Sequence, residues 1–205
     1  IYIMSTYKIK CISLPRREDR RIKMKHMFGK HDFEFVDAID GKDYKLTKFD
    51  KEFIKGNDYK KHGIHIPSLV CANYMHLNLL DECANQPWEL RDVPYFIFED
   101  DVKLEKPLPF SFEEIAAKKD LHYFWLIKEE PSIAAYVVWP DGAKIMRDYI
   151  INEVKLKKGL DWSFFDLRKT DKLVGEQVED SYFTTVPGED SDITTLKNYD
   201  ISSNK

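Results

Sequence analysis

The chain has few cysteines, little glycine and proline, and no long hydrophobic run. Its 205 residues include 3 Cys, 8 Gly and 9 Pro. Three scattered cysteines are too few for a disulfide framework or a paired-cysteine zinc site, which favours a reducing compartment. The longest apolar stretches, 95–98 and 133–140, fall far short of the ~20 residues that a membrane helix requires, and residues 1–10 lack a secretory pattern. We therefore expect a cytoplasmic protein without a transmembrane segment.

An excess of positive charge is also absent. The chain has 32 Lys and Arg against 36 Asp and Glu, a net charge of -4, which disfavours a general nucleic-acid binder. Hydrophobic residues make up 43% and aromatic residues 14%, which excludes wholesale disorder. We expect one domain over residues 1–190, followed by a flexible polar tail over 191–205.

The first part of the chain alternates strand-like and helix-like patterns. Polar and apolar side chains alternate over residues 8–14, which predicts a strand with one buried face. Residues 16–28 have apolar side chains at a helical period and stop at Gly29, and residues 33–36 alternate again. Strand, helix and strand in this order predict a parallel pair with a right-handed crossover.

Three segments follow with distinct patterns. Residues 42–63 are rich in lysine and poor in aliphatic side chains, so we expect a mobile, solvent-facing loop. From Pro67 to Cys83, apolar residues recur at spacings of three and four, which predicts a helix. Residues 93–98 form a continuous apolar run, typical of a central strand covered on both faces.

The remaining segments continue the alternation. Residues 121–127 and 134–139 predict two strands, and Asp141 is the expected N-cap of a helix over 142–154. An aromatic segment follows at 160–166, and residues 182–186 predict a last short strand. The whole pattern predicts an α/β fold with a mostly parallel central sheet flanked by helices.

Three acidic residues, Glu99, Asp100 and Asp101, directly follow the apolar run at 93–98. In open α/β sheets, ligands collect outside the carboxyl ends of the strands. Adjacent carboxylates repel one another unless a cation lies among them, and hard oxygen ligands suit magnesium or manganese. The competing interpretation is a strand that ends in a solvated acidic turn.

A second polar cluster runs from Ser13 and Leu14 into the arginine-rich start of the first predicted helix. Helix N-terminal amides and guanidinium groups favour a phosphate by charge and geometry together. Arg16, Arg20 and Arg21 are the candidates, although only one or two of them can face inward from a helix. A solvated face of self-paired Arg and Glu side chains is the alternative.

Together these motifs resemble glycosyltransferase family 25, which includes lipopolysaccharide and procollagen galactosyltransferases. The resemblance extends over nearly the whole chain in the right order. It rests on Ile12-Ser13-Leu14 with the arginines to Arg21, Phe33 to Gly41, Phe96 to Val102 with the three acids, Ala134 to Val138 with Gly142-Ala143, Leu160-Asp161-Trp162 and, more weakly, Ser191-Asp192-Ile193.

The resemblance implies a GT-A-like nucleotide-binding fold and a nucleotide-sugar donor, commonly a UDP-sugar, held with manganese or magnesium. Transfer of a hexose such as galactose or glucose with inversion is implied, to a hydroxyl of a glycan, lipid-linked glycan or glycoprotein acceptor. Asp101 is the first candidate metal ligand, with Asp100 or Glu99 assisting. Donor binding is expected from Ser13, Leu14, Arg16, Arg20, Asp37, Ala38, His76, Glu99 and Asp100.

Two positions depart from the family pattern. Met75-His76 stands where such enzymes usually have Ser-His, and a glycine often found ahead of the Ala-Tyr segment is absent near Ser132-Ile133. The chain is also shorter between the acids and Ala134. These departures bear on acceptor recognition more than on donor binding.

An inverting transfer requires a general base near the acceptor hydroxyl, and Asp161 is the candidate. Its aromatic neighbours Trp162, Phe164 and Phe165 suit stacking on a sugar, and desolvation would raise the basicity of the carboxylate. The alternative is that Asp161 caps a helix whose aromatic residues are core. His76 lies on the apolar face of its predicted helix, where a core or site-adjacent role competes with direct chemistry.

Two other functions use the same acids. A metal-dependent phosphatase or nuclease also gathers carboxylates at strand ends, although it needs further acids from other strands. A non-catalytic module that binds nucleotide sugars would retain the fold without turnover. Manganese-dependent hydrolysis of UDP-sugars distinguishes the three.

Overall fold

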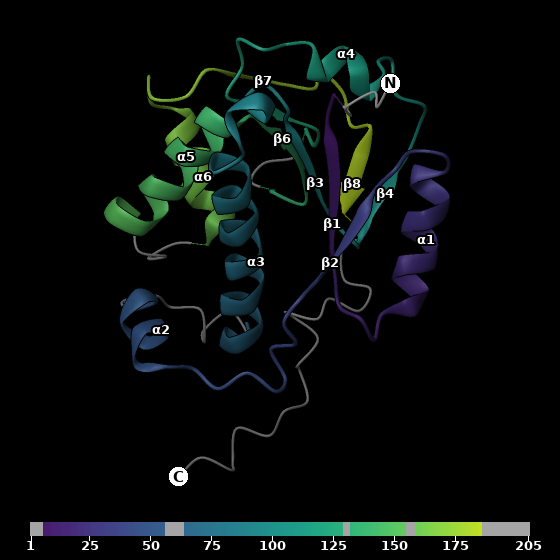
Figure 1. Ribbon diagram of the computed structural model, residues 1–205. Coiled ribbons are helices and arrows are strands. Elements are labelled where there is room, and N and C mark those ends of the chain that lie inside the picture. The colour runs from purple at the N-terminus through teal and green to yellow at the C-terminus, as the bar shows by residue number, and fades with distance from the viewer. Residues whose placement is uncertain (1–5, 56–63, 129–131, 155–158, 186–205) are drawn as a thin grey trace.

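The structure is a computed structural model, which describes residues 6–55, 64–128, 132–154 and 159–185. The predicted tail at 191–205, Ser191-Asp192-Ile193 and part of the lysine-rich segment therefore lie outside the described residues. The chain is a mixed α/β protein with helices on both faces of a central sheet (Figure 1).

The strands are β1 (Lys8–Ser13), β2 (Glu34–Asp37), β3 (Tyr95–Glu99), β4 (Val102–Leu104), β5 (Tyr123–Trp125), β6 (Ala135–Val138), β7 (Gly175–Gln177) and β8 (Phe183–Thr185). The helices are α1 (Glu18–Phe28), α2 (Lys48–Phe53), α3 (Ile66–Ala84), the 3-10 turn η2 (Trp88–Leu90), α4 (Phe112–Ala116), α5 (Pro140–Asp148), its π-helical continuation η3 (Tyr149–Val154) and α6 (Leu160–Arg168).

The central sheet has six strands in the order β2-β1-β3-β6-β5-β7. β1 pairs in parallel with both β2 and β3, whereas β6 is antiparallel to its neighbours β3 and β5. β7 pairs in parallel with β5, so only β6 runs against the rest. The prediction of a mostly parallel, GT-A-like sheet flanked by helices is therefore confirmed.

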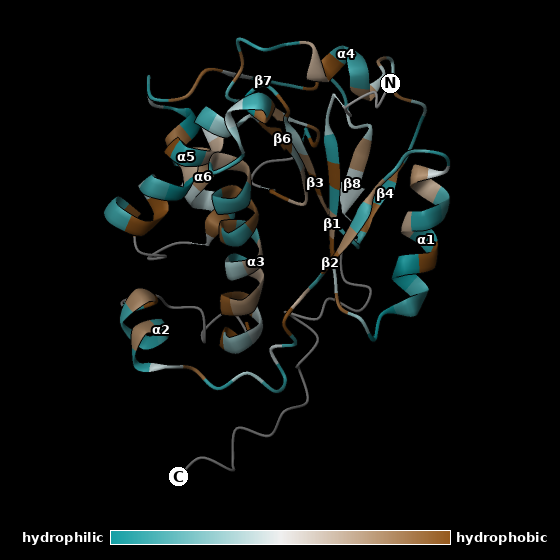
Figure 2. Cartoon of the chain, in the orientation of Figure 1, coloured by the Kyte–Doolittle hydropathy of each residue, from teal (hydrophilic) through white to brown (hydrophobic). Residues whose placement is uncertain are grey.

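The sheet is covered on both faces because its central strands are apolar throughout. In β3, Tyr95 and Ile97 belong to one hydrophobic cluster, which also contains core residues of α3, α5 and α6. Phe96 and Phe98 belong to a second cluster on the other face, which contains residues of α1 and α4. In Figure 2 the ribbon of α1 is mostly teal, hydrophilic, with shorter brown, hydrophobic stretches.

Most of the predicted elements are present. α1 ends at Gly29, whose φ of 56° lies in the left-handed region that glycine adopts without cost. α3 begins one residue before Pro67, which occupies the first turn, where its missing N–H costs nothing. The run at 93–98 forms β3, which lies at the centre of the sheet between β1 and β6.

Two local predictions are wrong. Residues 48–53 form helix α2 rather than a solvent-facing loop, because a reciprocal cap joins Thr47 and Asp50 and the aromatic ring of Phe53 is buried in the core. The hydroxyls of Tyr44 and Tyr74 also donate to the Asp50 carboxylate. The many lysines of the segment suggested exposure throughout, so the buried Asp50 was not predicted.

The helix predicted to begin at Asp141 begins earlier. Trp139 is the N-cap of α5, Pro140 occupies its first turn, and Asp141 is exposed within that turn. Proline fixes the backbone angle that a first helical residue needs, so it starts the helix without a side-chain cap. Gly142 is required here because a Cβ would lie 2.1 Å from the carbonyl oxygen of His122.

A second sheet lies beside α1. β4 follows the acidic residues directly and pairs antiparallel with β8. Only the β8 partner was predicted, as a strand over 182–186, since three residues of β4 are too few for a periodic pattern. Within the described residues, no helix is long and apolar enough to cross a membrane.

Candidate active site

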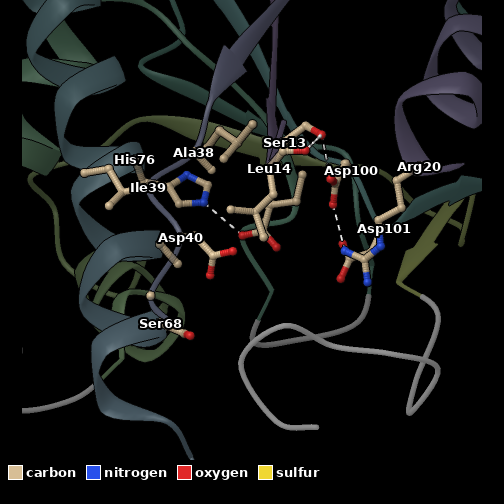
Figure 3. Close-up of a pocket in the computed structure, with 14 residues that line it drawn as sticks. Ser13, Leu14, Arg20, Ala38, Ile39, Asp40, Ser68, His76, Asp100 and Asp101 are labelled. Atoms are coloured by element: carbon tan, nitrogen blue, oxygen red, sulfur yellow. Dashed lines mark hydrogen bonds and ion pairs between the residues drawn. The ribbon is translucent and has the colours of Figure 1, made fainter. Parts of the chain in front are cut away.

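The three acids lie at the carboxyl end of β3, between two cavities. Glu99 is the last residue of β3, and Asp100 and Asp101 form the turn that leads into β4. Figure 3 shows Asp100 and Asp101 facing Arg20 on one side of Ser13 and Leu14, with His76 and Asp40 on the other side. The turn thus presents its carboxylates in different directions.

Asp100 is held by two partners. Its Oδ1 lies 2.7 Å from Nη1 of Arg20, and its Oδ2 accepts a hydrogen bond of 2.7 Å from the Ser13 hydroxyl. Arg20 and Asp100 are both about 9% exposed, so this ion pair is buried. Asp100 is consequently committed to bonds within the protein and anchors α1 to the end of β3.

Asp101 has a different environment. Its Oδ1 is buried and has no hydrogen-bond partner among the residues that the structure describes. Burial, and secondarily the negative charge of Glu99, raise the pKa of Asp101 to about 7. An unpaired buried carboxylate oxygen is costly, and a bound cation would remove that cost.

The side chain of Glu99 is directed toward α3 and away from the unpaired oxygen of Asp101. His76 Nε2 lies 2.9 Å from its Oε1, and His76 Nδ1 lies 3.2 Å from the hydroxyl of Tyr136 on β6. The imidazole is 1% exposed and also stacks on the Tyr136 ring. His76 therefore joins the helix, the sheet and the acidic turn.

Asp161 lies on the same face of the sheet as His76. It belongs to the first turn of α6, and its Oδ1 accepts a 2.9 Å hydrogen bond from the backbone amide of Ile133. Burial, followed by the charge of Glu99, raises the pKa of Asp161 to about 6, although the Ile133 bond and His76 oppose this. Gly159, not Asp161, is the N-cap of the helix, so the capping alternative does not describe it.

Arg16 and Arg21 form ion pairs with carboxylates at the end of β2 and in the loop that follows it. Arg16 pairs with Asp40, and Arg21 pairs with Asp37 while also donating to the Ser13 backbone oxygen. Burial alone would raise the pKa of Asp40, but Arg16 and the Lys42 amide hold it below its ordinary value. Both arginines thus stabilise the loop that follows β2.

The first of the two cavities, here the β1–α3 cavity, has a volume of about 100 Å³. Of the residues predicted to bind the donor or metal, it is lined by Ser13, Leu14, Arg20, Ala38, His76, Glu99, Asp100 and Asp101. Arg16, Asp37 and Asp161 do not line it, although Arg16 and Asp37 contact residues that do. A space of this size holds a ring rather than a whole sugar nucleotide.

Several residues that line the cavity, including Ile39, Asp40, Gly41 and Ser68, were not predicted as site residues from the sequence. Gly41 lies so close to α3 that a Cβ on it would be 2.3 Å from the Cα of Ser68. The Asp40-Gly41 pair after a strand indicated that the backbone passes close to another element here. Which element that is, helix α3, could not be predicted from the sequence.

The second cavity, here the α1–β4 cavity, has a volume of about 990 Å³. Its walls come from α1 and from the β4–β8 sheet, and Arg20, Asp100 and Asp101 line it as well as the β1–α3 cavity. The buried ion pair and the unpaired Asp101 oxygen therefore lie where the two cavities meet.

Residues 7–141 match the family model described as glycosyltransferase family 25 (LPS biosynthesis protein). The chain belongs to glycosyltransferase family 25. This glycosyltransferase is accordingly expected to use a sugar donor and a glycan acceptor. The resemblance to the family is confirmed over residues 7–141, and the motifs at 160–162 and 191–193 lie outside the matched residues. No curated protein matches the chain significantly.

The residues of this glycosyltransferase fit a divalent cation that is only partly coordinated by protein. The unpaired oxygen of Asp101 is a suitable hard ligand. No cluster of three His, Cys, Asp or Glu side chains arranged to hold a metal occurs within the described ranges. Magnesium-like ions are commonly held by one or two carboxylates together with substrate phosphates and water, so the small donor set is compatible with such an ion.

Proposed function

We propose that this member of glycosyltransferase family 25 transfers a hexose from a UDP-sugar to a hydroxyl of a glycan, with manganese or magnesium bound at Asp101. The observation that carries the proposal is the buried, unpartnered Asp101 oxygen at the junction of the two cavities. A cation bound there would act as a Lewis acid on the departing diphosphate.

The proposed donor site is the β1–α3 cavity together with the crevice that leads to Asp101. Ser13, Leu14 and Ala38 border a space suited to the base or ribose of the donor, and Arg16 lies beside it through its bond to Asp40. The volume of about 100 Å³ leaves the diphosphate and the sugar outside, toward the acids. Glu99 would assist Asp101 in binding the metal. His76 positions Glu99, since its Nε2 lies 2.9 Å from the Glu99 Oε1.

Asp161 is the proposed general base. Its carboxylate is close enough to Glu99 for that charge to raise its pKa, and a pKa of about 6 leaves it mostly deprotonated yet basic at neutral pH. It would accept the proton of the acceptor hydroxyl as the new glycosidic bond forms and the bond to the diphosphate breaks. Trp162, 53% exposed and adjacent in sequence, offers an aromatic face for a sugar.

The test combines binding and turnover on the same protein. We expect titration calorimetry to show UDP-sugar binding that depends on manganese, and slow release of free sugar and UDP when no acceptor is present. Release of inorganic phosphate instead would indicate a phosphatase, and tight binding without any turnover a non-catalytic module. Absence of metal-coupled binding for every UDP-sugar tried would overturn the proposal.

The acceptor class is tested separately from the donor. The family description supports a glycan of lipopolysaccharide biosynthesis over a protein acceptor. We expect product formation with lipid-linked or free oligosaccharide acceptors and none with a collagen peptide bearing hydroxylysine. The opposite preference would overturn the choice of acceptor but leave the donor assignment intact.

A further inference from the structure

The α1–β4 cavity is much larger than the β1–α3 cavity and shares with the proposed donor site only Arg20, Asp100 and Asp101. Its volume of about 990 Å³ lies at the upper end of the range of small-molecule sites, ~300–1,000 Å³. Figure 1 shows α1 standing beside the β4–β8 pair, and the cavity lies between them. The space is therefore sufficient for an oligosaccharide fragment.

The helical wall of the cavity presents a row of side chains on one face of α1. Arg20, Lys23 and Met27 follow one another at spacings of three and four, and His26 lies next to Lys23 on the same side. Lys25, on the same helix, does not line the cavity. The position of each residue around the helix therefore determines which basic side chains of α1 line the cavity.

Most of the charges around the cavity are neutralised by a partner in the protein. The pairs are Arg17 with Asp19 at 3.0 Å, Arg20 with Asp100 at 2.7 Å, and Lys103 with Glu105 at 3.0 Å. Lys23 and His26 are exposed, and neither side chain has a hydrogen bond or ion pair with any residue in the described part of the chain. Two donors, one of them a permanent cation, therefore remain for a ligand.

The opposite wall suits a carbohydrate. Thr184 and Thr185 on β8 bring hydroxyl groups, and the Thr184 hydroxyl bonds to Glu105. Val102 and Leu104 on β4 add apolar surface of the kind that packs against the C–H face of a sugar. The lining has four lysine or arginine side chains and four carboxylates, and after pairing only Lys23 and, at the other end of the cavity, Asp101 remain. Hydroxyls, apolar surface and the cation of Lys23 beside His26 together favour a glycan whose anionic substituent lies at α1.

We propose that the α1–β4 cavity binds the acceptor through a phosphate or carboxylate group that Lys23 and His26 contact. This inference rests on the proposed function: the anionic end of the acceptor would lie at α1, and its reacting hydroxyl would pass Asp100 and Asp101, which line both cavities, to reach the base Asp161, which lines neither. An ammonium contacts a phosphate as a point charge, so the site selects for charge and leaves sugar identity to the hydroxyl contacts of β8.

The probes are glucose 6-phosphate, glucose and inorganic phosphate, added to the full-length ¹⁵N-labelled protein and followed by NMR. We expect saturable shifts from glucose 6-phosphate at the amides of Lys23, Lys103 and Thr185, and much weaker ones from glucose or phosphate alone. Lys23→Glu should weaken this binding about five- to tenfold, since it removes one attraction and adds one repulsion. Lys25→Glu is the matched control and should change it less than twofold.

The result that overturns the inference is equal loss of affinity in Lys23→Glu and Lys25→Glu, or shifts that spread over the whole surface. Binding of UDP-sugar, followed at Ser13 and Ala38, is recorded on the same samples. If the donor fails to bind while the sugar phosphate binds at α1, the proposed function is wrong and the anion site stands. If the donor binds normally and Lys23→Glu leaves sugar phosphate binding unchanged, the anion site is wrong.

Steady-state kinetics test the proposed acceptor site independently of the binding measurements. With a phosphorylated glycan acceptor, Lys23→Glu should raise the acceptor KM about five- to tenfold and leave the donor KM unchanged. Lys23→Ala should have the same effect in smaller measure, which excludes an artefact of the introduced carboxylate. An unchanged acceptor KM in both variants would overturn the inference.

Discussion

Arg20 on α1 and Asp100 after β3 form a buried ion pair, with 2.7 Å between guanidinium and carboxylate, at the boundary shared by the two cavities. The pair joins elements 80 positions apart in the sequence. The Ser13 hydroxyl satisfies the second carboxylate oxygen, so the group is a network rather than an isolated pair. It fixes the acidic turn relative to β1 and α1.

Removal of Arg20 should destabilise the fold because it leaves Asp100 buried with a single partner. For Arg20→Met we expect a loss of about 3–5 kcal/mol in the free energy of unfolding, measured by urea denaturation. Lys119→Met is the control, since Lys119 pairs with Asp92 at the exposed surface and should cost less than about 1 kcal/mol. Equal effects of the two substitutions would show that the buried pair does not anchor the turn.

Asp101→Asn should stabilise the metal-free protein at high pH. The pKa of Asp101 rises from 3.8 to about 7 on folding, so between these pH values the folded state binds a proton that the unfolded state has released. The stability of the wild type should therefore fall as the pH rises from about 4 to 7, and the variant should lose this component. We expect the variant to be more stable by about 1–3 kcal/mol at pH 8.

Manganese should reverse that order. A ligand present at about 100 times its Kd stabilises the folded state by about 2.7 kcal/mol, which corresponds to roughly 5–10 °C in Tm for a chain of this size. The wild type and the control Asp141→Asn, which alters an exposed carboxylate, should show this shift, and Asp101→Asn should not. A full manganese shift in Asp101→Asn would refute the metal assignment.

Asp161→Asn should leave donor affinity within about twofold and lower the rate of transfer by about 100- to 10,000-fold, since only proton removal is lost. In the wild type the base acts when deprotonated, so kcat/KM should rise with pH through about 6 and then level off. Asp166→Asn is the control on the same helix, where Asp166 is only partly buried and faces Lys169. A loss of donor affinity equal to the loss of rate would contradict the assignment.

Gly41→Ala should separate donor binding from stability. Its Cβ would lie 2.3 Å from the Ser68 Cα, so the loop after β2 must move away from α3, at a cost of about 1–3 kcal/mol. Gly29→Ala costs a similar amount, roughly 1–2 kcal/mol, through its left-handed backbone, and its Cβ meets nothing nearer than 4.0 Å. We expect calorimetry to show weaker UDP-sugar binding for Gly41→Ala alone. Equal donor affinity in the two variants would remove this loop from the binding site.

The order of strands and helices was predictable because each element has a local pattern. Alternation over β1, the apolar run of β3 and the apolar period of α3 each reflect the faces that the residues bury. The three acids could be predicted as site residues because they directly follow the apolar run of a buried strand. α2 and β4 were missed because a helix of six residues fixed by a buried Asp50, and a strand of three, have too little pattern of their own.

By itself, the sequence determined the α/β class, the family and the place of Glu99, Asp100 and Asp101 at the tip of a central strand, because these depend on local periodicity and on contiguous motifs. Only the tertiary structure decided that Asp100 is bound to Arg20 and Ser13, that Glu99 is bound to His76, and that a buried Asp101 oxygen has no partner within the described ranges. These roles depend on neighbours that are distant in the chain, and three consecutive carboxylates have the same chemistry until folding gives each a different partner.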